Sequence, residues 1–419
     1  MKKNIIIMLL FLPFLINAMD FIPGLDLNGS ITYPTILTNE SSELDKKIGA
    51  ETGLAGSFML NTDFLPQLWL IPTITLNYSS TAQPLNVDDQ KFLFSQWLDI
   101  YFSGGFNYDI LDNFQFRIRG FYRLDYAQQT MDEKLGKGLY DYIDTGFYAE
   151  TYFKIDITSY PVETTVGFKY IDKKFPNYES LSSMVNPDTI GGTLNAAAKK
   201  EKDNLTYSFY ISNEIKLGDS GWMALISFNY DYMPYLEQRI ISQIGELTDA
   251  KRIDRFATLD INLPYYKDAI SGMEVGYSLT VKTTDQNYYD SLENLDPGDD
   301  VFTSNYYSYI DHIIKLSLTY EFPFELFTKY KPAAVFGFSY DTLNYTDRMA
   351  KLQDGTYSKE KQQENNYKLS FDIKQNITDY WNYYLNTTFI RYLSNMKWEA
   401  YGTYNYTYLT ISLGTAISF

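Results

Sequence analysis

The chain has 419 residues, including 40 Tyr, 28 Phe, one His and no Cys. It carries 35 basic and 52 acidic residues, and the resulting net charge of −17 disfavours nucleic acid and anionic membrane surfaces as partners. Without Cys, the chain has no disulfides, no cysteine nucleophile and no lipoprotein anchor.

The first predicted element is a secretory signal peptide at residues 1–18. Two lysines follow the initial Met, an apolar stretch runs to Ile16, and the small residue Ala18 suits cleavage. The stretch is too short to form a membrane-spanning helix. We therefore expect an exported chain whose mature part, residues 19–419, has a net charge of about −19, because cleavage removes both lysines.

The mature part shows no linker, and we predict that it forms a single domain. No later segment has the ~18 consecutive apolar residues that a membrane helix requires. The mean hydropathy is −0.29. If the protein lies in a membrane, it must therefore do so as a β-barrel.

Alternation of polar and apolar residues is the main structural signal. In residues 114–126 the even positions carry no charge, whereas the odd positions include Arg117, Arg119 and Arg123. Residues 143–157 repeat this pattern. A period of two predicts β-strands with unlike environments on their two faces. A soluble sandwich could show the same alternation, so the pattern alone does not decide the class of fold.

The spacing of these segments predicts a transmembrane antiparallel up-and-down β-barrel of sixteen strands, with fourteen as an alternative. Every second connection is short, as at residues 109–113, and the others are longer and charged, including residues 171–203, 285–305 and 343–365. Short turns are expected in the periplasm and long loops outside the cell. The predicted strands lie near residues 25–37, 48–60, 68–78, 94–108, 114–126, 143–157, 162–170, 204–217, 222–233, 253–263, 272–284, 306–322, 332–342, 366–377, 381–393 and 404–419.

The last segment ends in AISF, and on its apolar parity lie Ile411, Leu413 and Ile417 before the terminal Phe419. This ending, the signal segment, the absent Cys, the alternation along the chain and the aromatic content of 17% occur together. With these features the chain resembles a bacterial outer-membrane porin or porin-like barrel. The resemblance implies a place in outer-membrane lipid of a diderm bacterium. It also implies that these four residues form the signal read by the barrel-assembly machinery, with periplasmic chaperones as further partners. Homotrimers are common among sixteen-stranded porins.

The charged parity of the central strands supplies the candidate pore lining. A polar lumen conducts water and ions, and charges across it sort those ions. Taken over all the predicted strands, the charges of the inner parity are close to balanced with acidic residues slightly ahead, which favours a weak preference for cations. An alternative is that these charges only pair across strands and solvate the interior. The candidate lining residues are Arg117, Arg119, Arg123, Glu150, Lys154, Asp156, Glu163 and Lys169.

The function predicted from these features is passive diffusion of small hydrophilic solutes and ions, without enzymatic activity, cofactor or metal. His312 shares the parity of apolar residues and should face lipid, opposite Asp311, so it cannot complete a wet catalytic dyad. One alternative is a closed surface barrel whose acidic loops make it an adhesin or binding protein. Another is a transporter for hydrophobic substrates, which the charged inner parity disfavours.

The sequence also supports expectations about two loops and three polar side chains. Residues 171–203 either narrow the pore from inside or form an external loop, and the acidic residues 293–300 are expected to be solvated rather than to hold calcium. The side chains that fit the lipid-facing parity poorly are Asn213, Gln375 and Arg391.

Overall fold

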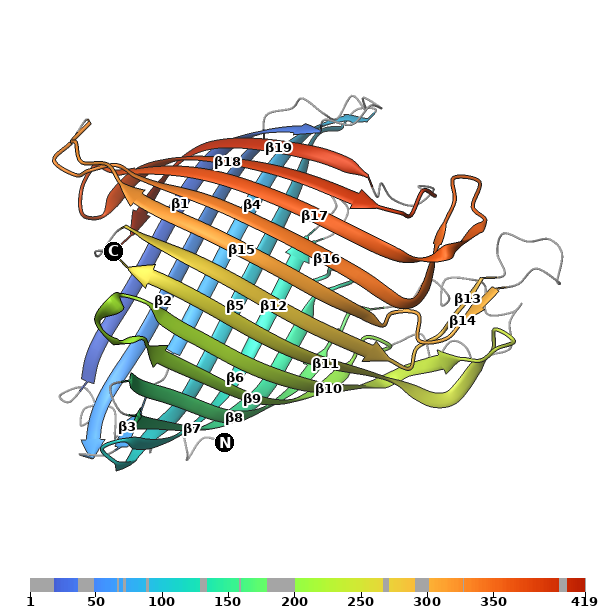
Figure 1. Cartoon of the computed structure of the whole chain (residues 1–419), viewed down its shortest axis with the longest axis horizontal. Helices are drawn as coiled ribbons and strands as arrows, with labels where there is room; N and C mark the ends of the chain where they lie inside the picture. The colour runs from blue at the N-terminus through green and yellow to red at the C-terminus, as the bar shows by residue number, and fades with distance from the viewer. Residues whose placement is uncertain are drawn as a thin grey trace.

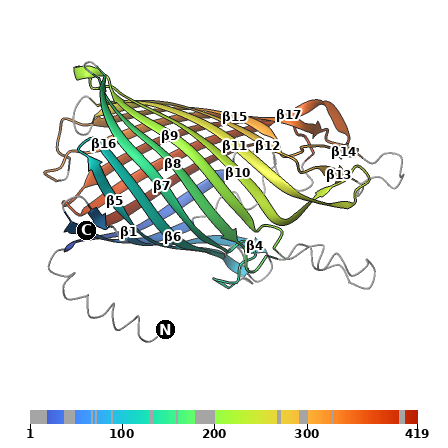
Figure 2. The same ribbon diagram turned by 90° about the horizontal axis from the view of Figure 1, so that it is seen from below.

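The structure is a computed structural model in which most described residues belong to one continuous sheet (Figure 1). Strands inclined to the long axis wrap around a closed cylinder, as a second view confirms (Figure 2). The structure describes residues 19–36, 49–65, 68–70, 73–87, 90–128, 134–157, 160–178, 200–266, 271–290, 301–326, 328–398 and 405–418. Among them, no helix has the length and apolar character needed to cross a membrane.

Sixteen long antiparallel strands form the barrel. Each pairs with the strands before and after it in the sequence, which is up-and-down topology. The sixteen are β1 (Met19–Ile36), β2 (Gly49–Leu65), β4 (Thr73–Val87), β5 (Gln90–Leu111), β6 (Phe114–Gln128), β7 (Tyr142–Ile157), β8 (Tyr160–Lys174), β9 (Asn204–Lys216), β10 (Met223–Ile241), β11 (Leu247–Tyr266), β12 (Gly272–Thr284), β15 (Tyr309–Glu321), β16 (Ala333–Lys351), β17 (Tyr357–Asn376), β18 (Trp381–Ser394) and β19 (Tyr406–Ser418).

Four short elements accompany the barrel. β3 (Leu68–Leu70) pairs with β2 and β5, and the one-turn 3-10 helix η3 (Gly218–Ser220) connects β9 to β10. β13 (Tyr288–Asp290) and β14 (Val301–Thr303) form a separate hairpin in the connection from β12 to β15. Figures 1 and 2 both place this hairpin beyond the barrel, at the end opposite the C-terminus.

Closure depends on the pairing of the first strand with the last. β1 pairs with β19 from Asp26 opposite Ser418 to Ile36 opposite Tyr408, and with β2 on its other side. The ladder therefore has no free edge at this seam, and the backbone groups find their partners within the barrel. That is the condition for a sheet to exist in lipid.

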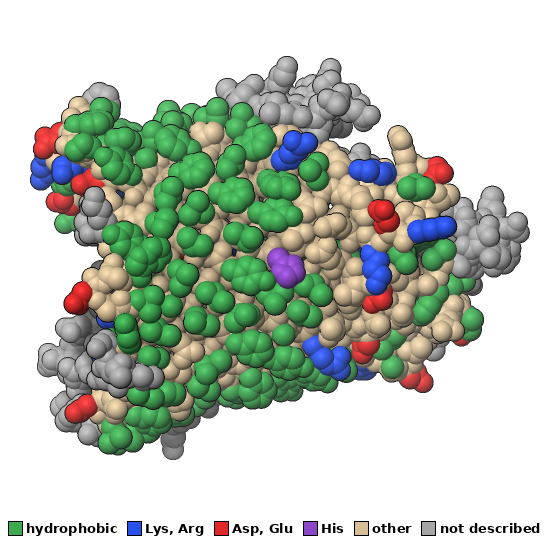
Figure 3. All heavy atoms as spheres, in the orientation of Figure 1, with side chains coloured by type: hydrophobic (Ala, Val, Ile, Leu, Met, Phe, Trp, Pro, Cys, Tyr) green, Lys and Arg blue, Asp and Glu red, His purple; other side chains and the backbone are tan. Residues whose placement is uncertain are grey.

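Residues of each strand alternate between an apolar outer face and a polar inner face. Outward side chains such as Phe228, Leu318 and Phe371 are 43%, 40% and 42% exposed. Figure 3 shows apolar side chains spread over the barrel wall, with charged side chains gathered at the two ends. Exposed apolar surface of this extent marks contact with a membrane rather than with water.

The predicted sixteen strands and their antiparallel order are confirmed. The prediction of a long loop at residues 343–365 is wrong, because β16 continues to Lys351 and β17 starts at Tyr357. A tight turn joins them, in which Gly355 has φ +87° and the Leu352 amide donates to the Thr356 carbonyl at 2.8 Å. Both faces of this extension are polar, so the hydropathy signal of a membrane strand is lost although the ladder continues into water.

Two of the poorly fitting outward side chains have local partners. The Gln375 amide nitrogen donates to the Thr328 hydroxyl at 2.9 Å and to the Tyr330 carbonyl at 2.7 Å. The connection from β15 to β16 therefore covers Gln375, which is 9% exposed. Asn213 accepts a hydrogen bond from Thr164 at 2.8 Å on the same outer face. The amide nitrogen of Gln375 and the carbonyl oxygen of Asn213 thus bind neighbouring groups near a barrel end, whereas Oε1 of Gln375 is buried without a described partner.

The assignment of faces predicts that substitutions at two adjacent residues of β17 differ strongly in their effect on stability. We expect Leu369→Arg, on the outer face, to lower the free energy of unfolding by about 2–4 kcal/mol, because it places a charge in lipid. Ser370→Arg, on the inner face, should change it little. Urea titration in lipid vesicles measures both, and equal losses would contradict the assignment of faces.

Candidate pore lining

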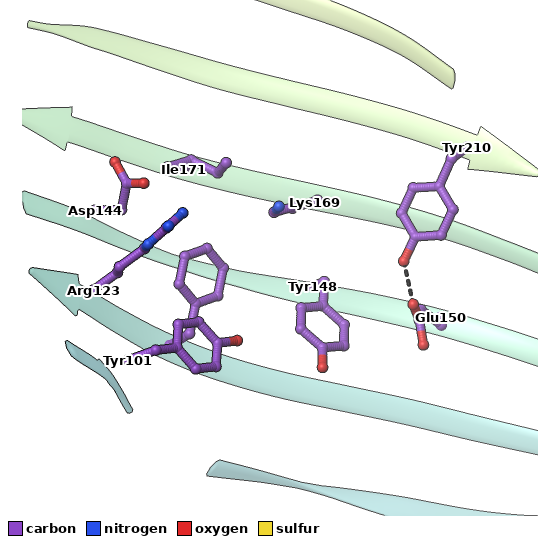
Figure 4. Close-up of a pocket in the computed structure, with 9 residues that line it drawn as sticks. Tyr101, Arg123, Asp144, Tyr148, Glu150, Lys169, Ile171 and Tyr210 are labelled. Atoms are coloured by element: carbon purple, nitrogen blue, oxygen red, sulfur yellow. Dashed lines mark hydrogen bonds between the residues drawn. The ribbon is translucent and has the colours of Figure 1, made fainter. Parts of the chain in front are cut away.

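A hollow of about 410 Å³ opens on the inner face of strands β5 to β9. Its walls carry basic, acidic and aromatic side chains that point toward one another (Figure 4). The rings of Tyr101 and Phe121 stack at one side, with centroids 5.9 Å apart. The lining residues are Tyr101, Phe121, Arg123, Asp144, Tyr148, Glu150, Lys169, Ile171 and Tyr210.

Arg123 is held by two buried carboxylates. Its Nε atom is 2.7 Å from Asp99 Oδ1, and its Nη2 atom is 3.7 Å from Asp125 Oδ2. Asp99 and Asp125 are only 6% and 7% exposed. Trp97 also donates from its indole nitrogen to Asp125 at 3.1 Å. This arginine is therefore committed to the wall, where it compensates two charges that water does not reach.

Arg117 and Arg119 have aromatic neighbours in place of ion pairs. The Arg117 guanidinium lies 4.8 Å from the ring centre of Tyr152, and that of Arg119 lies 5.9 Å from the ring centre of Tyr148. Arg117 also donates to Gln115. Within the described ranges, neither arginine forms an ion pair. Their positive charge is therefore not cancelled by a directly bound carboxylate.

The remaining candidates of this wall are tied across strands. Glu150 on β7 accepts a hydrogen bond from the Tyr210 hydroxyl on β9. The Lys154 ammonium is 3.7 Å from the Glu163 carboxylate. Lys169 lies 5.6 Å from the ring centre of Phe121. Cross-strand contacts of this kind are the unit that stabilises a sheet.

The structure brings most of the predicted lining residues to one inner face. The register pairs Arg117 with Glu150, and Arg119 with Tyr148 of the hollow. Glu163 lines a second hollow of about 270 Å³ together with Tyr152. Asp156 pairs with Pro161 through its backbone, and its side chain lies outside the description.

Sequence reasoning missed the partners of these residues. Tyr101 and Phe121 complete the hollow, and Asp99 and Asp125 hold Arg123, but only the register of β5 against β6 brings these four residues together. An expected register for the two-residue turn between β5 and β6 could have found them, since Leu111 and Phe114 flank it.

A second polar cluster, also missed, surrounds Asp254 near the outer end of β11. Asp254 is fully buried and accepts hydrogen bonds from Arg252 at 2.6 and 2.8 Å and from Thr284 at 2.6 Å. The Lys282 ammonium is 3.3 Å away. The Arg252 guanidinium lies 5.1 Å from the ring centre of Tyr307, in the connection that carries β13 and β14. The cluster therefore ties this connection to the barrel.

Charged groups in the outer connections experience different solvation. Burial raises the pKa of the Glu201 carboxyl and lowers that of the adjacent Lys202 ammonium. At the exposed tip between β16 and β17, hydrogen bonds from Thr356 instead lower the pKa of Asp354. Water is therefore partly excluded beside the start of β9 but not at the hairpin tip.

The outer face holds the side chains expected there. His312 lies among the apolar side chains of that face, and its Nδ1 atom is 2.9 Å from the Tyr277 hydroxyl (Figure 3). Asp311 faces inward in the same strand. Ile411 and Leu413 are 42% and 64% exposed on the outer face. Ile417 shares that parity in β19.

Several expectations fall outside the described residues. They concern the signal segment 1–18, the centre of the loop at 171–203, the acidic residues 293–300 and the terminal Phe419. Within the described ranges, no group of three or more His, Asp or Glu side chains is placed to bind a metal ion.

No family model and no curated protein matches this sequence. Similar solved structures include OccAB3 of Acinetobacter baumannii, with 10% identity, a TM-score of 0.48 and coverage of 96% of this chain and 100% of that one. OprB of Pseudomonas putida has 12% identity, a TM-score of 0.48 and coverage of 97% and 96%. These values are too low to support an argument, so the architecture rests on the strand pairing described above.

The closed sixteen-stranded ladder, the apolar outer wall and the polar inner wall together define a class. The protein is a transmembrane antiparallel β-barrel of sixteen strands. Its outward positions contact lipid, and its inward positions line the interior.

The buried pairing of Arg123 predicts a stabilising role for this residue. We expect Arg123→Gln to lower the free energy of unfolding by about 1–3 kcal/mol, because Asp99 and Asp125 lose their cation inside the wall. Adding Asp99→Asn should recover part of that loss, since one uncompensated carboxylate is removed. Urea titration followed by tryptophan fluorescence measures both variants. An unchanged midpoint for Arg123→Gln would show that the pair contributes nothing.

Proposed function

We propose that the protein is an outer-membrane pore for passive diffusion of small hydrophilic solutes and ions. The observation that carries the proposal is the contrast between the two faces of one closed sheet. The outer face is apolar, whereas the inner face carries charged, amide and hydroxyl side chains around the barrel. A polar interior within a lipid-facing wall is the arrangement of an aqueous channel.

The distribution of charge supports a weak preference for cations. Around the hollow, basic residues are numerous but Arg123 is neutralised by its two carboxylates. On the inner face of strands β9 to β17, acidic side chains predominate and give this wall a negative potential. The acids there include Glu214, Asp231, Asp254, Asp260, Glu274, Asp311, Glu321, Asp341, Glu364 and Asp372, and the bases include Lys216, Arg252, Lys282, Lys315, Lys368 and Lys374.

The same proposal includes export and assembly. Residues 1–18 have the composition of a cleaved signal peptide. Outward Ile411, Leu413 and Ile417, followed by Phe419, would present the assembly signal along the last strand. β19 closes the barrel by pairing with β1. If the assembly machinery binds β19 before that pairing forms, it can control when the barrel closes and enters the membrane.

Conductance in a planar bilayer tests the pore directly. We expect the refolded mature protein to give stable current steps, and the reversal potential in a KCl gradient to indicate a mild preference for potassium. A folded, inserted protein that gives no current would contradict the pore and favour a closed surface barrel that binds through its loops.

Neutralising Arg117 and Arg119, which form an arginine stripe on β6, tests whether these side chains face the ion path. We expect Arg117→Gln with Arg119→Gln to raise the potassium-to-chloride permeability ratio by roughly 1.5- to 3-fold, because two uncancelled positive charges leave the wall. Arg255→Gln is the matched control, since Arg255 lies beside Tyr232 on the outer face. If the control shifts the ratio as much as the double variant, the stripe does not face the ion path.

A further inference from the structure

Most glycines on the inner face of the barrel share a feature that outward glycines lack. At seven inward positions, side-chain atoms of the residue paired with the glycine occupy the space that a Cβ atom would fill, whereas at inward Gly272 a backbone oxygen of Tyr265 occupies it. Outward Gly104 has no atom within 4 Å of that point, and outward Gly120 has only a backbone oxygen at 3.9 Å. The inward pairs are Gly53–Asn28, Gly105–Arg119, Gly146–Phe121, Gly167–Tyr210, Gly276–Asn262, Gly337–Ser370 and Gly414–Tyr384.

Gly167 and Tyr210 show most clearly what this arrangement does. Tyr210 leaves β9, its ring crosses β8 directly over Gly167, and its hydroxyl donates to Glu150 on β7 (Figure 4). The Tyr210 hydroxyl oxygen and Cε2 atom would lie 2.5 and 2.8 Å from an added Cβ. The ring therefore lies against the wall only because residue 167 has no side chain.

We propose that these inward glycines are seats that hold the paired side chains flat against the wall, and that Gly167, whose seat holds the long Tyr210 side chain, sets the size of solute that passes the hollow. This inference rests on the proposed pore function. A ring lifted from its seat occupies space in the lumen beside Tyr148 and Lys169, which line the same hollow. Lumen width limits the size of the solute, so the seat acts as a specificity determinant.

Gly167 is the best of these positions to test. The three atoms nearest an added Cβ all belong to the Tyr210 side chain, which can move. At Gly146 and Gly414 the added atom would also meet backbone oxygens, of Tyr170 and Gly29, so a substitution there would disturb the ladder itself. Overpacking at residue 167 is relieved most easily by turning the ring away from the wall.

The experiment compares Gly167→Ala with Gly167→Ala combined with Tyr210→Ser. We expect the single variant to lower single-channel conductance roughly 1.5-fold and to reduce the largest neutral polymer that enters the pore. The double variant should recover at least the original conductance, because the displaced ring is gone. Gly337→Ala, whose seat holds only the Ser370 hydroxyl, and outward Gly104→Ala are controls that should leave conductance unchanged.

Unfolding provides a readout that does not depend on conduction. Gly167→Ala should lower the urea midpoint when Tyr210 is present and have little effect in the Tyr210→Ser background. Conductance unaltered by Gly167→Ala, or not recovered in the double variant, would overturn the inference, as would equal losses of stability in both backgrounds. If the unmodified protein forms no pore, the proposed function fails. The comparison of urea midpoints in the two Tyr210 backgrounds still decides whether the position of the Tyr210 ring depends on Gly167.

Discussion

The structure depends on one constraint, which is that a sheet surrounded by lipid can leave no backbone hydrogen bond unmade. The pairing of β1 with β19 meets this constraint, because it removes the two edges that a chain of paired strands would otherwise expose. Once the ladder is closed, successive side chains must point alternately to lipid and to the interior. The apolar outer wall and the charged inner wall are therefore consequences of the same backbone arrangement.

The inner wall is organised by contacts between neighbouring strands rather than by a core. A barrel of this width has too large an interior for side chains from opposite walls to fill it. Charged and aromatic groups instead find partners one or two strands away, as Arg123 on β6 does with Asp99 on β5 and Glu150 on β7 does with Tyr210 on β9. Glycines contribute to these contacts by leaving room for them. Because Gly167 has no side chain, the Tyr210 ring can lie against the wall there. The open interior is the space that these lateral contacts do not occupy.

The outer end of the barrel follows different rules because water surrounds both faces of its strands. There β10, β11, β16 and β17 extend as polar hairpins, and Asp254 is buried among Arg252, Thr284 and Lys282. A buried carboxylate with this many donors orders the connection around it, and losing one donor would leave a charge poorly compensated. The same physical demand, that buried polar groups be paired, thus shapes both the inner wall and the outer end of the barrel.

The sequence by itself determined the number of strands, their order and the face on which each residue lies. A period of two fixes those properties wherever the two environments differ, as the inward Arg117 and outward His312 illustrate. It could not reveal the hairpin extension at residues 343–365, where water on both sides removes the contrast. Nor could it reveal the partners of Arg123 or the seat of Tyr210. These depend on the register between neighbouring strands, which only the closed tertiary structure decided, because closure sets how far each strand is shifted against the next.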